Sequence, residues 1–219
     1  MECFVIFVMA WCCIYATILS RETLAVIATR RRKTELTKKL IHPDLINSNN
    51  TFSEIELINN YIFQVCGIML ENVETELESQ EYFAHNFELN KQKAKFRMAK
   101  ITPTKTGQFV AIWKRNENGI TEPHNVDDEF DFFIIATRQE EKFGVFIFNK
   151  TVLSENKILT TKKSHGKRGI RVYPTWSITE NKQAKKTQNW QTKYFVEIWT
   201  ETDINKAKEL LKIELKELT

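Results

Sequence analysis

The segment DFFIIATRQEEKFGVFIF, residues 131–148, decides the fold class of this protein. It contains two apolar runs, Asp131–Thr137 and Phe143–Phe148, that are rich in Phe, Ile and Val. Short runs of this composition are typical of buried β-strands. We therefore expect a β-sheet at the centre of the protein.

Further strands and several helices are expected on both sides of this segment. The other predicted strands are Lys95–Ile101, Gln108–Arg115 and Gly169–Tyr173, with turn signals at Pro103, Asn118-Gly119 and Gly144. The predicted helices start at Ser53, cover residues 71–83, extend from Asn181 to Trp199, and start again at Asp203 to run through Leu218. Strands between helices predict an α/β fold with a mixed, largely antiparallel sheet flanked by helices.

The composition excludes several classes of protein. With 42% hydrophobic residues and 15 Phe in 219 residues, the chain is globular rather than disordered, collagen-like or a continuous coiled coil. Only 6 Gly are present, which argues against a Gly-rich nucleotide-binding fold. Three of the 4 Cys lie in the first thirteen residues, so neither a disulfide framework nor a zinc site is expected. The sequence has no HExxH, G-x-S-x-G or Walker motif, and we expect no small-molecule cofactor.

The first fifty residues differ from the rest of the chain. Residues 3–20 carry no charge, and a basic cluster, Arg30-Arg31-Arg32-Lys33, follows them. This pattern predicts a membrane anchor whose basic flank keeps the remaining chain in the cytoplasm. Two alternatives stay open: a leader that is absent from the mature protein, and a helix of the domain. We therefore divide the chain into residues 1–50, a hydrophobic leader or membrane anchor with a linker, and residues 51–219, an α/β domain.

Positive charge is concentrated in the second half of the domain. Between Lys142 and Lys193 there are twelve basic and two acidic residues, a net charge of +10. Two segments hold most of these cations: a helix, and a loop in which Gly166 and Gly169 would let a ligand approach the backbone. The residues predicted to contact DNA or RNA phosphates are Lys167, Arg168, Arg171, Lys182, Lys186 and Lys193. Such binding should be independent of nucleotide sequence and weakened by salt.

Other interpretations of these residues stay open. Lysines on a surface helix often do no more than face water. Trp176 and Trp190 lie in the same region and would either stack on bases or pack in the core. The basic face could instead meet anionic lipid or an acidic protein surface, above all if residues 3–20 tether the chain to a membrane.

A series of short motifs in the domain resembles the MepB family over residues 54–199. The matching strings are AKITPTKxGQFV (99–110), WKR (113–115), DF (131–132), FIFxK (146–150), GKRGxRVYP (166–174) and KQAxKTQxWQ (182–191). Asn149 stands where Pro is expected in this family. The family is named for a bacterial multidrug-efflux gene cluster, and its members have no assigned reaction. The resemblance implies a restriction-endonuclease-like three-layer core and, with it, a nucleic-acid ligand.

A nuclease of that fold needs an acid on a helix, an Asp at the start of a strand, and an acid-x-Lys motif on the next strand. Asp131 and Lys150 fit the strand positions, and Glu81, or else Glu78, fits the helix acid. Phe148 departs from the pattern because its ring cannot bind Mg²⁺ as a carboxylate would. We therefore expect a nucleic-acid-binding protein with a degenerate nuclease-like site and no bound metal. A Mg²⁺-dependent nuclease is the alternative.

Overall fold

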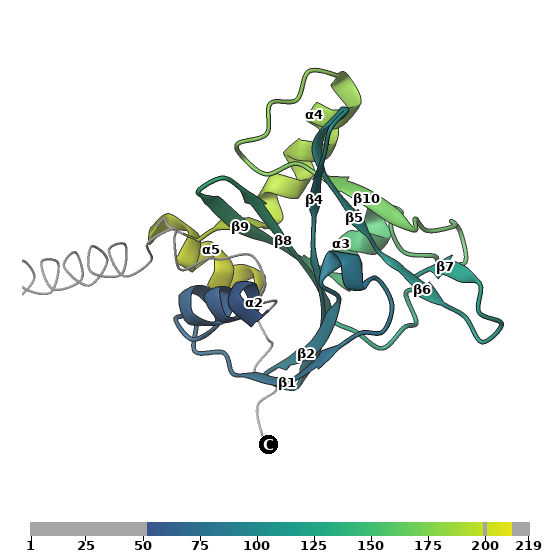
Figure 1. Cartoon of the computed structure of the whole chain (residues 1–219), viewed down its shortest axis with the longest axis horizontal. Coiled ribbons are helices and arrows are strands. Elements are labelled where there is room, and N and C mark those ends of the chain that lie inside the picture. The colour runs from purple at the N-terminus through teal and green to yellow at the C-terminus, as the bar shows by residue number, and fades with distance from the viewer. Residues whose placement is uncertain (1–51, 199–200, 212–219) are drawn as a thin grey trace, which may run out of the picture. The chain divides into compact units, whose positions relative to one another are not determined.

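The computed structural model describes residues 52–198 and 201–211 (Figure 1). The chain divides into two compact units, Met1–Asn49 and Asn50–Thr219, and all of the described residues belong to the second unit. The predicted leader or anchor at residues 3–20 lies outside the described residues. Within the described ranges, no helix is both long and apolar enough to cross a membrane.

A central sheet of six strands forms the middle of the domain. Its strands are β1 (Leu70–Thr75), β2 (His85–Leu89), β3 (Gln92–Met98), β8 (Phe132–Gln139), β9 (Lys142–Asn149) and β11 (Phe195–Glu197), in the spatial order β1-β2-β3-β8-β9-β11. The pair β3 and β8 is parallel, and the other neighbours are antiparallel. The predicted mixed, largely antiparallel sheet is therefore confirmed, with the two runs of residues 131–148 as its central hairpin.

Two smaller sheets and a set of short helices complete the domain. A three-stranded sheet has the order β10-β5-β4 and consists of β4 (Lys100–Thr102), β5 (Lys105–Ala111) and β10 (Gly169–Val172); we call it the small sheet. Strands β6 (Trp113–Arg115) and β7 (Thr121–Pro123) form a separate hairpin. The helices are α2 (Phe52–Ile58), the π-helical η2 (Asn59–Phe63), the 3-10 helices η3 (Gln80–Tyr82) and η4 (Thr192–Tyr194), α3 (Lys150–Glu155), α4 (Lys182–Gln191) and α5 (Glu201–Leu210).

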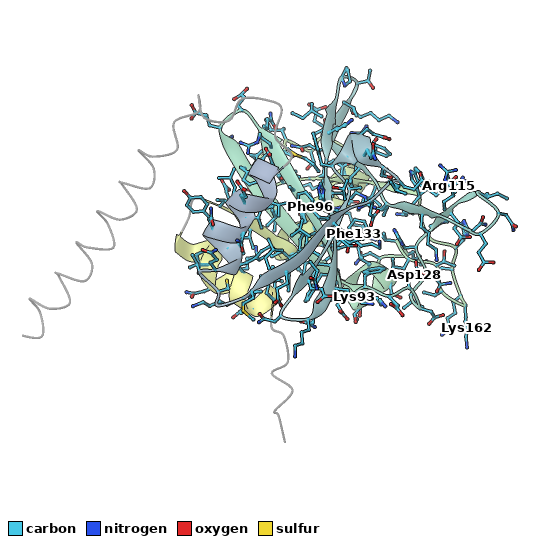
Figure 2. The ribbon with its side chains drawn as sticks, turned by 60° about the horizontal axis from the view of Figure 1, so that its bottom comes forward. Lys93, Phe96, Arg115, Asp128, Phe133 and Lys162 are labelled. Carbon is cyan, nitrogen blue, oxygen red and sulfur yellow. The ribbon has the colours of Figure 1, made fainter. Side chains whose placement is uncertain are left out.

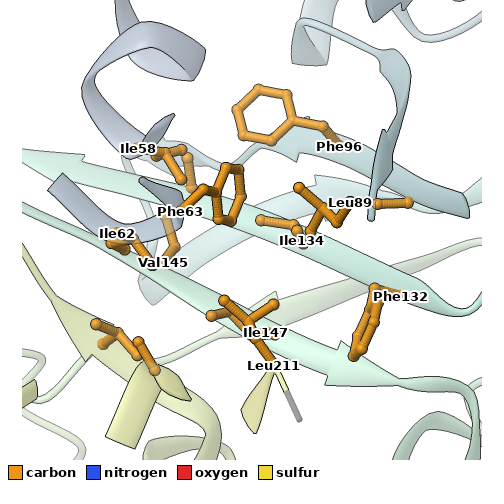
Figure 3. Close-up of a cluster of buried hydrophobic side chains, with 14 of the residues drawn as sticks. Ile58, Ile62, Phe63, Leu89, Phe96, Phe132, Ile134, Val145, Ile147 and Leu211 are labelled. Carbon is orange, nitrogen blue, oxygen red and sulfur yellow. The ribbon is translucent and has the colours of Figure 1, made fainter. Parts of the chain in front are cut away.

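The central hairpin is apolar on both faces because each face is covered by another layer. Figure 3 shows one face, where Phe132, Ile134, Val145 and Ile147 of the sheet pack against Ile58, Ile62, Phe63 and Leu211 of the helical layer. On the other face, Phe133 and Phe148 pack against Val110 and Ile170 of the small sheet and Val152 of α3. Each such side chain contributes about 1.5–3 kcal/mol when fully buried. The small sheet is therefore held to the central sheet by a continuous apolar core.

Three local predictions are wrong. Residues 71–83 do not form a helix: they contribute to β1, a sheet-edge strand on which Glu71 and Glu74 face water, and to η3. The helix predicted for residues 181–199 ends as α4 at Gln191 and as η4 at Tyr194, because the next residues pair with β9 as β11. Gly144 lies inside β9 and not in a turn. Packing explains the glycine there, because a Cβ would come within 2.4 Å of the Phe195 ring.

Candidate nucleic-acid interface

Most cations of residues 142–193 lie at the two ends of strand β10. The loop of residues 162–168 precedes β10, and α4 follows it (Figure 1). At the first end, the Ile112 N–H donates to the Arg168 carbonyl at 3.0 Å. At the other end, the buried Gln191 side chain of α4 accepts from the Tyr173 N–H and donates to the Arg171 carbonyl, both at 2.9 Å. These bonds fix the loop and the helix on the small sheet.

The loop before β10 is closed by its own hydroxyl groups. The Thr161 hydroxyl accepts from the Ser164 N–H at 3.2 Å, and the Thr160 hydroxyl accepts from the Gly166 N–H at 3.0 Å. A Cβ at Gly166 would lie 2.6 Å from the Thr160 nitrogen, and one at Gly169 would lie 2.6 Å from the Phe109 ring. The prediction that these glycines leave the backbone open to a ligand is wrong, because the protein's own atoms occupy the space. The loop offers its side chains instead, and its exposed cations are Lys162, Lys163, Lys167 and Arg168.

Helix α4 starts at a side-chain cap and presents its lysines to solvent. The Asn181 side chain accepts from the Ala184 N–H at 2.7 Å, and Ala184 faces inward with 4% of its surface exposed. Lys182, Lys185 and Lys186 of α4 and Lys193 of η4 are exposed. The two tryptophans of this region belong to the core side, because the rings of Trp190 and Phe148 lie 5.4 Å apart and those of Trp176 and Phe195 lie 5.3 Å apart.

Ion pairing divides the cations of the domain into two groups. Cations of residues 93–138 form a series of ion pairs with carboxylates. These paired cations are Lys93, Lys95, Arg97, Lys114, Arg115 and Arg138. In the described part of the chain, no lysine or arginine between Lys142 and Lys193 is paired with a carboxylate. Among the described residues, the cations at the ends of β10 therefore have no carboxylate that neutralises them directly.

Arg171 is a residue of β10, between the exposed cations of the loop and those of α4. Its side chain binds the turn between β4 and β5. Its Nη1 donates to the carbonyls of Lys105, Thr106 and Gly107 at 3.1–3.4 Å, and its Nη2 donates to the Thr102 hydroxyl at 2.7 Å. The guanidinium thereby ties the turn between β4 and β5 to β10. All of its acceptors are uncharged, so its positive charge still acts on the surface. Phosphate contact by Arg171 stays a prediction, as it does for Lys167, Arg168, Lys182, Lys186 and Lys193.

The catalytic candidates Asp131 and Lys150 lie next to each other but use their side chains for internal bonds. Asp131 Oδ2 accepts from the Lys93 N–H at 2.8 Å, and the Asp131 N–H donates to the Lys93 carbonyl at 2.8 Å. The Lys150 N–H donates to the Asp131 carbonyl at 3.1 Å, whereas Lys150 Nζ donates to the Asp128 carbonyl at 2.6 Å. Asp131 thus fastens the start of β8 to β3, and Lys150 fastens the loop before β8 to α3.

Among the described residues, the acids proposed for the helix position do not form a metal-binding group with Asp131. Glu81 is an exposed residue of η3, and Glu78 is bound to Arg115 with a shortest distance of 2.6 Å. Phe148 is buried, with its ring 5.5 Å from that of Phe146. Within the described ranges, no three His, Cys, Asp or Glu side chains are close enough to hold a metal ion together. A catalytic role for Asp131, Lys150 and Glu81 stays a prediction.

A buried polar cluster that the sequence did not indicate lies beside the second core. Asp128 Oδ2 accepts from His124 Nδ1 at 3.0 Å and from the Asn125 N–H at 2.9 Å, while Oδ1 accepts from Lys114 Nζ. Burial opposes ionisation of Asp128, but the hydrogen bonds from His124 and Lys114 outweigh it and hold the pKa of this carboxyl well below its usual range. Burial lowers the pKa of His124, whose Nε2 has no hydrogen-bond partner in the described structure and lines an apolar pocket with Ile112.

A second buried network also lies beside Phe133. Arg97 has no exposed surface, its guanidinium carbon lies 5.6 Å from the Phe133 ring centroid, and it is paired with Glu76, which also binds Lys95 at 2.7 Å. Burial disfavours the charge of Glu76, but the two cations outweigh this effect and lower its pKa. Figure 2 shows Phe133 near the middle of the domain and Lys162 at its periphery. In both networks the cations are bound to a carboxylate of the same network, so neither competes with the exposed lysines for an anion.

The sequence and the fold of this chain are similar to those of known proteins. A sequence model of the MepB-like family matches residues 76–197. A crystal structure of MepB is similar to this chain with a TM-score of 0.57 and 38% sequence identity, covering 58% of this chain and 86% of that one. I-Ssp6803I, a bacterial homing endonuclease, is more distant, with a TM-score of 0.32, 14% identity and coverage of 62% of this chain and 89% of its own. No curated protein matches the sequence.

Proposed function

Because this chain belongs to the MepB-like family, which has no assigned reaction, we propose from its surface that it is a nucleic-acid-binding protein. Its ligand is the phosphate backbone of DNA or RNA, and its binding surface is the small sheet with the loop of residues 162–168 and α4. We also propose a cytoplasmic location, which the basic cluster Arg30-Arg31-Arg32-Lys33 favours. The proposal requires no metal and no cleavage of the ligand.

The observation that carries the proposal is the separation of paired from unpaired cations. A surface lysine that only keeps a protein soluble is commonly balanced by nearby acids. Here six cations of residues 93–138 have a carboxylate partner, whereas the described cations of residues 142–193 have none. A polyanion is the ligand that such a surface attracts most strongly.

The type of contact predicts binding without strong sequence preference. Lysine ammonium groups on flexible stems bind phosphates as point charges and fix no base identity. Lys167 and Arg168 at one end of β10, and Lys182 and Lys186 at the other, would follow a backbone that runs along the small sheet. Each phosphate that is neutralised releases condensed counterions, so the affinity falls steeply with salt.

The test is fluorescence anisotropy of a labelled duplex with the full chain over a salt series. We expect the log–log salt slope to fall by about 0.9 for each phosphate-binding side chain that is removed in Lys167→Ala/Arg168→Ala and in Lys182→Ala/Lys186→Ala. Lys208→Ala is the matched control, because Lys208 is an exposed lysine of α5 in the helical layer. Circular dichroism of each variant checks that it is folded. A decrease of affinity in the control equal to that in the double variants would contradict the proposed surface.

A further inference from the structure

Resting on the proposed function, we further infer that the outer face of the small sheet binds unpaired bases, with Phe109 as the stacking residue. This inference names the form of the ligand: a single strand in preference to a duplex. It follows from which side chains the small sheet turns outward, from the position of the Phe109 ring, and from the charges beside that ring.

The strand register places an aromatic residue between two cations on the outer face. In the small sheet, Phe109 of β5 stands opposite Arg171 of β10 on one side and opposite Lys100 of β4 on the other. The residues on either side of Phe109 face inward: Val110 belongs to the second core, and Gln108 Nε2 donates to the Arg138 carbonyl of the central sheet at 3.2 Å. Because side chains alternate along a strand, Phe109 faces away from the core.

The ring of Phe109 lies across the sheet. Gly169 of β10 makes room for it, since a Cβ at this position would come within 2.6 Å of the ring atom Cζ. Tyr82 of η3 stands edge-on beside it with 6.1 Å between ring centroids, and Lys100 Nζ lies 5.0 Å from the centroid of Tyr82. Phe109 is half-buried and is not among the buried residues of either core cluster. The result is a partly exposed aromatic surface with a cation on each side.

A single strand is the ligand whose chemistry matches this arrangement. Its bases can stack on an aromatic ring, and its phosphates can bind the cations beside that ring. Neighbouring strands are about 4.8 Å apart, so Lys100 and Arg171 flank Phe109 at a distance that one nucleotide can span. Arg171 keeps its charge available because its acceptors are carbonyls and a hydroxyl. A duplex would reach the cations, but its bases are stacked on one another and leave the ring unused.

The experiment compares a labelled single strand with a duplex of equal length, using the full chain and the variant Phe109→Leu. We expect the wild-type protein to prefer the single strand and the variant to bind it about 5- to 100-fold more weakly. Duplex affinity should stay unchanged. Leucine removes the π-face but no charge, so the salt slope of single-strand binding should also stay unchanged. Phe109→Tyr, which keeps the ring, should retain the wild-type affinity.

A second variant removes a charge beside Phe109 and keeps the ring, so that its result does not depend on whether Phe109→Leu folds. Lys100→Met changes an exposed residue, and we expect it to lower the salt slope for the single strand by about 0.7. Tyr61→Leu, in the helical layer, is the aromatic control and should bind like the wild type. Equal affinity for both ligands, or equal weakening for both in folded Phe109→Leu, would overturn the inference and leave the proposed function standing. Absence of wild-type binding to either ligand at low salt would overturn both.

Discussion

At the scale of single residues, the neutral state of His124 is the most consequential feature of the buried clusters. Asp128 is ionised and accepts from Nδ1, so the proton of the neutral ring is on Nδ1 and the Nε2 lone pair faces apolar side chains. A second proton on Nε2 would be buried without an acceptor, which is why burial lowers the pKa of His124. The folded protein therefore resists protonation at this residue.

This resistance predicts how stability depends on pH. The unfolded chain protonates His124 near its ordinary pKa of 6.5, whereas the folded chain does so only at lower pH. The free energy of unfolding should therefore fall as the pH drops below about 6.5, by at most about 1.4 kcal/mol per pH unit. His124→Asn, whose amide can still donate to Asp128, should show a shallower fall in urea titrations between pH 7.5 and 5. The same change at the exposed His165 should keep the wild-type slope, and a slope in His124→Asn as steep as in the wild type would refute the assignment.

The sequence indicated which cations are exposed better than it indicated the contacts that hold the loop and α4 in place. The exposure of Lys167 and Lys182 could be predicted because a run of unbalanced charge is visible in the sequence. The clamp made by Gln191, and the Arg171 contact with the turn between β4 and β5, depend on partners that are 18–20 and 64–69 residues away in sequence. No local pattern marks a glutamine or an arginine for such a role.

At the scale of elements, the short helix α3 shows how one side chain sets a boundary. Asn149 ends β9, and its Oδ1 accepts from the Val152 N–H at 2.9 Å, which caps α3. Asparagine is among the best capping residues. This contact gives a physical reason for asparagine at the position where proline was expected.

We expect Asn149→Ala to destabilise the protein by about 1 kcal/mol, because the cap is removed. Asn149→Asp should retain most of the stability, since a carboxylate also accepts from the first turn of a helix. Asn181 caps α4 with the same chemistry, so Asn181→Ala tests the removal of an independent cap. Thermal or urea unfolding measures all three variants. A destabilisation in Asn149→Asp as large as in Asn149→Ala would rule out capping as the reason.

The fold could be predicted where burial decides the structure and not where the chain is at an edge. The two central strands are apolar on both faces, so their composition alone identifies them. Strand β1 is an edge strand with exposed glutamates, and glutamate-rich segments favour helix when considered locally. Strand β11 has three residues and exists because β9 offers it a partner. The parallel pairing of β3 with β8 joins segments that are separated in sequence by β4, β5, β6 and β7, and periodicity cannot reveal such a pairing.

At the scale of the whole molecule, the domain keeps an uncompensated positive region on one small sheet. Like charges gathered on a folded surface repel one another, and a bound polyanion relieves this repulsion. Any ligand that binds the folded chain and not the unfolded one also raises its stability.

We therefore expect a nucleic-acid oligomer at about 100 times its Kd to stabilise the full chain by about 2.7 kcal/mol, or roughly 5–10 °C in Tm. Differential scanning calorimetry at low salt measures the shift. The shift should shrink in Lys167→Ala/Arg168→Ala and disappear in high salt, because the attraction is screened. A neutral polymer serves as the control, and an equal shift with it would contradict an electrostatic origin.

The pairing of β5 with β10 also determines the order in which parts of the domain can form during synthesis. Strand β5 leaves the ribosome before the β8–β9 hairpin, but its partner β10 leaves after that hairpin. Chains generally fold from the amino-terminal side during synthesis. The central hairpin is therefore complete before β5 has its partner strand. The small sheet can be assembled only when translation has passed Val172. A nascent chain therefore forms its central hairpin first and completes the surface that we propose for nucleic acid last.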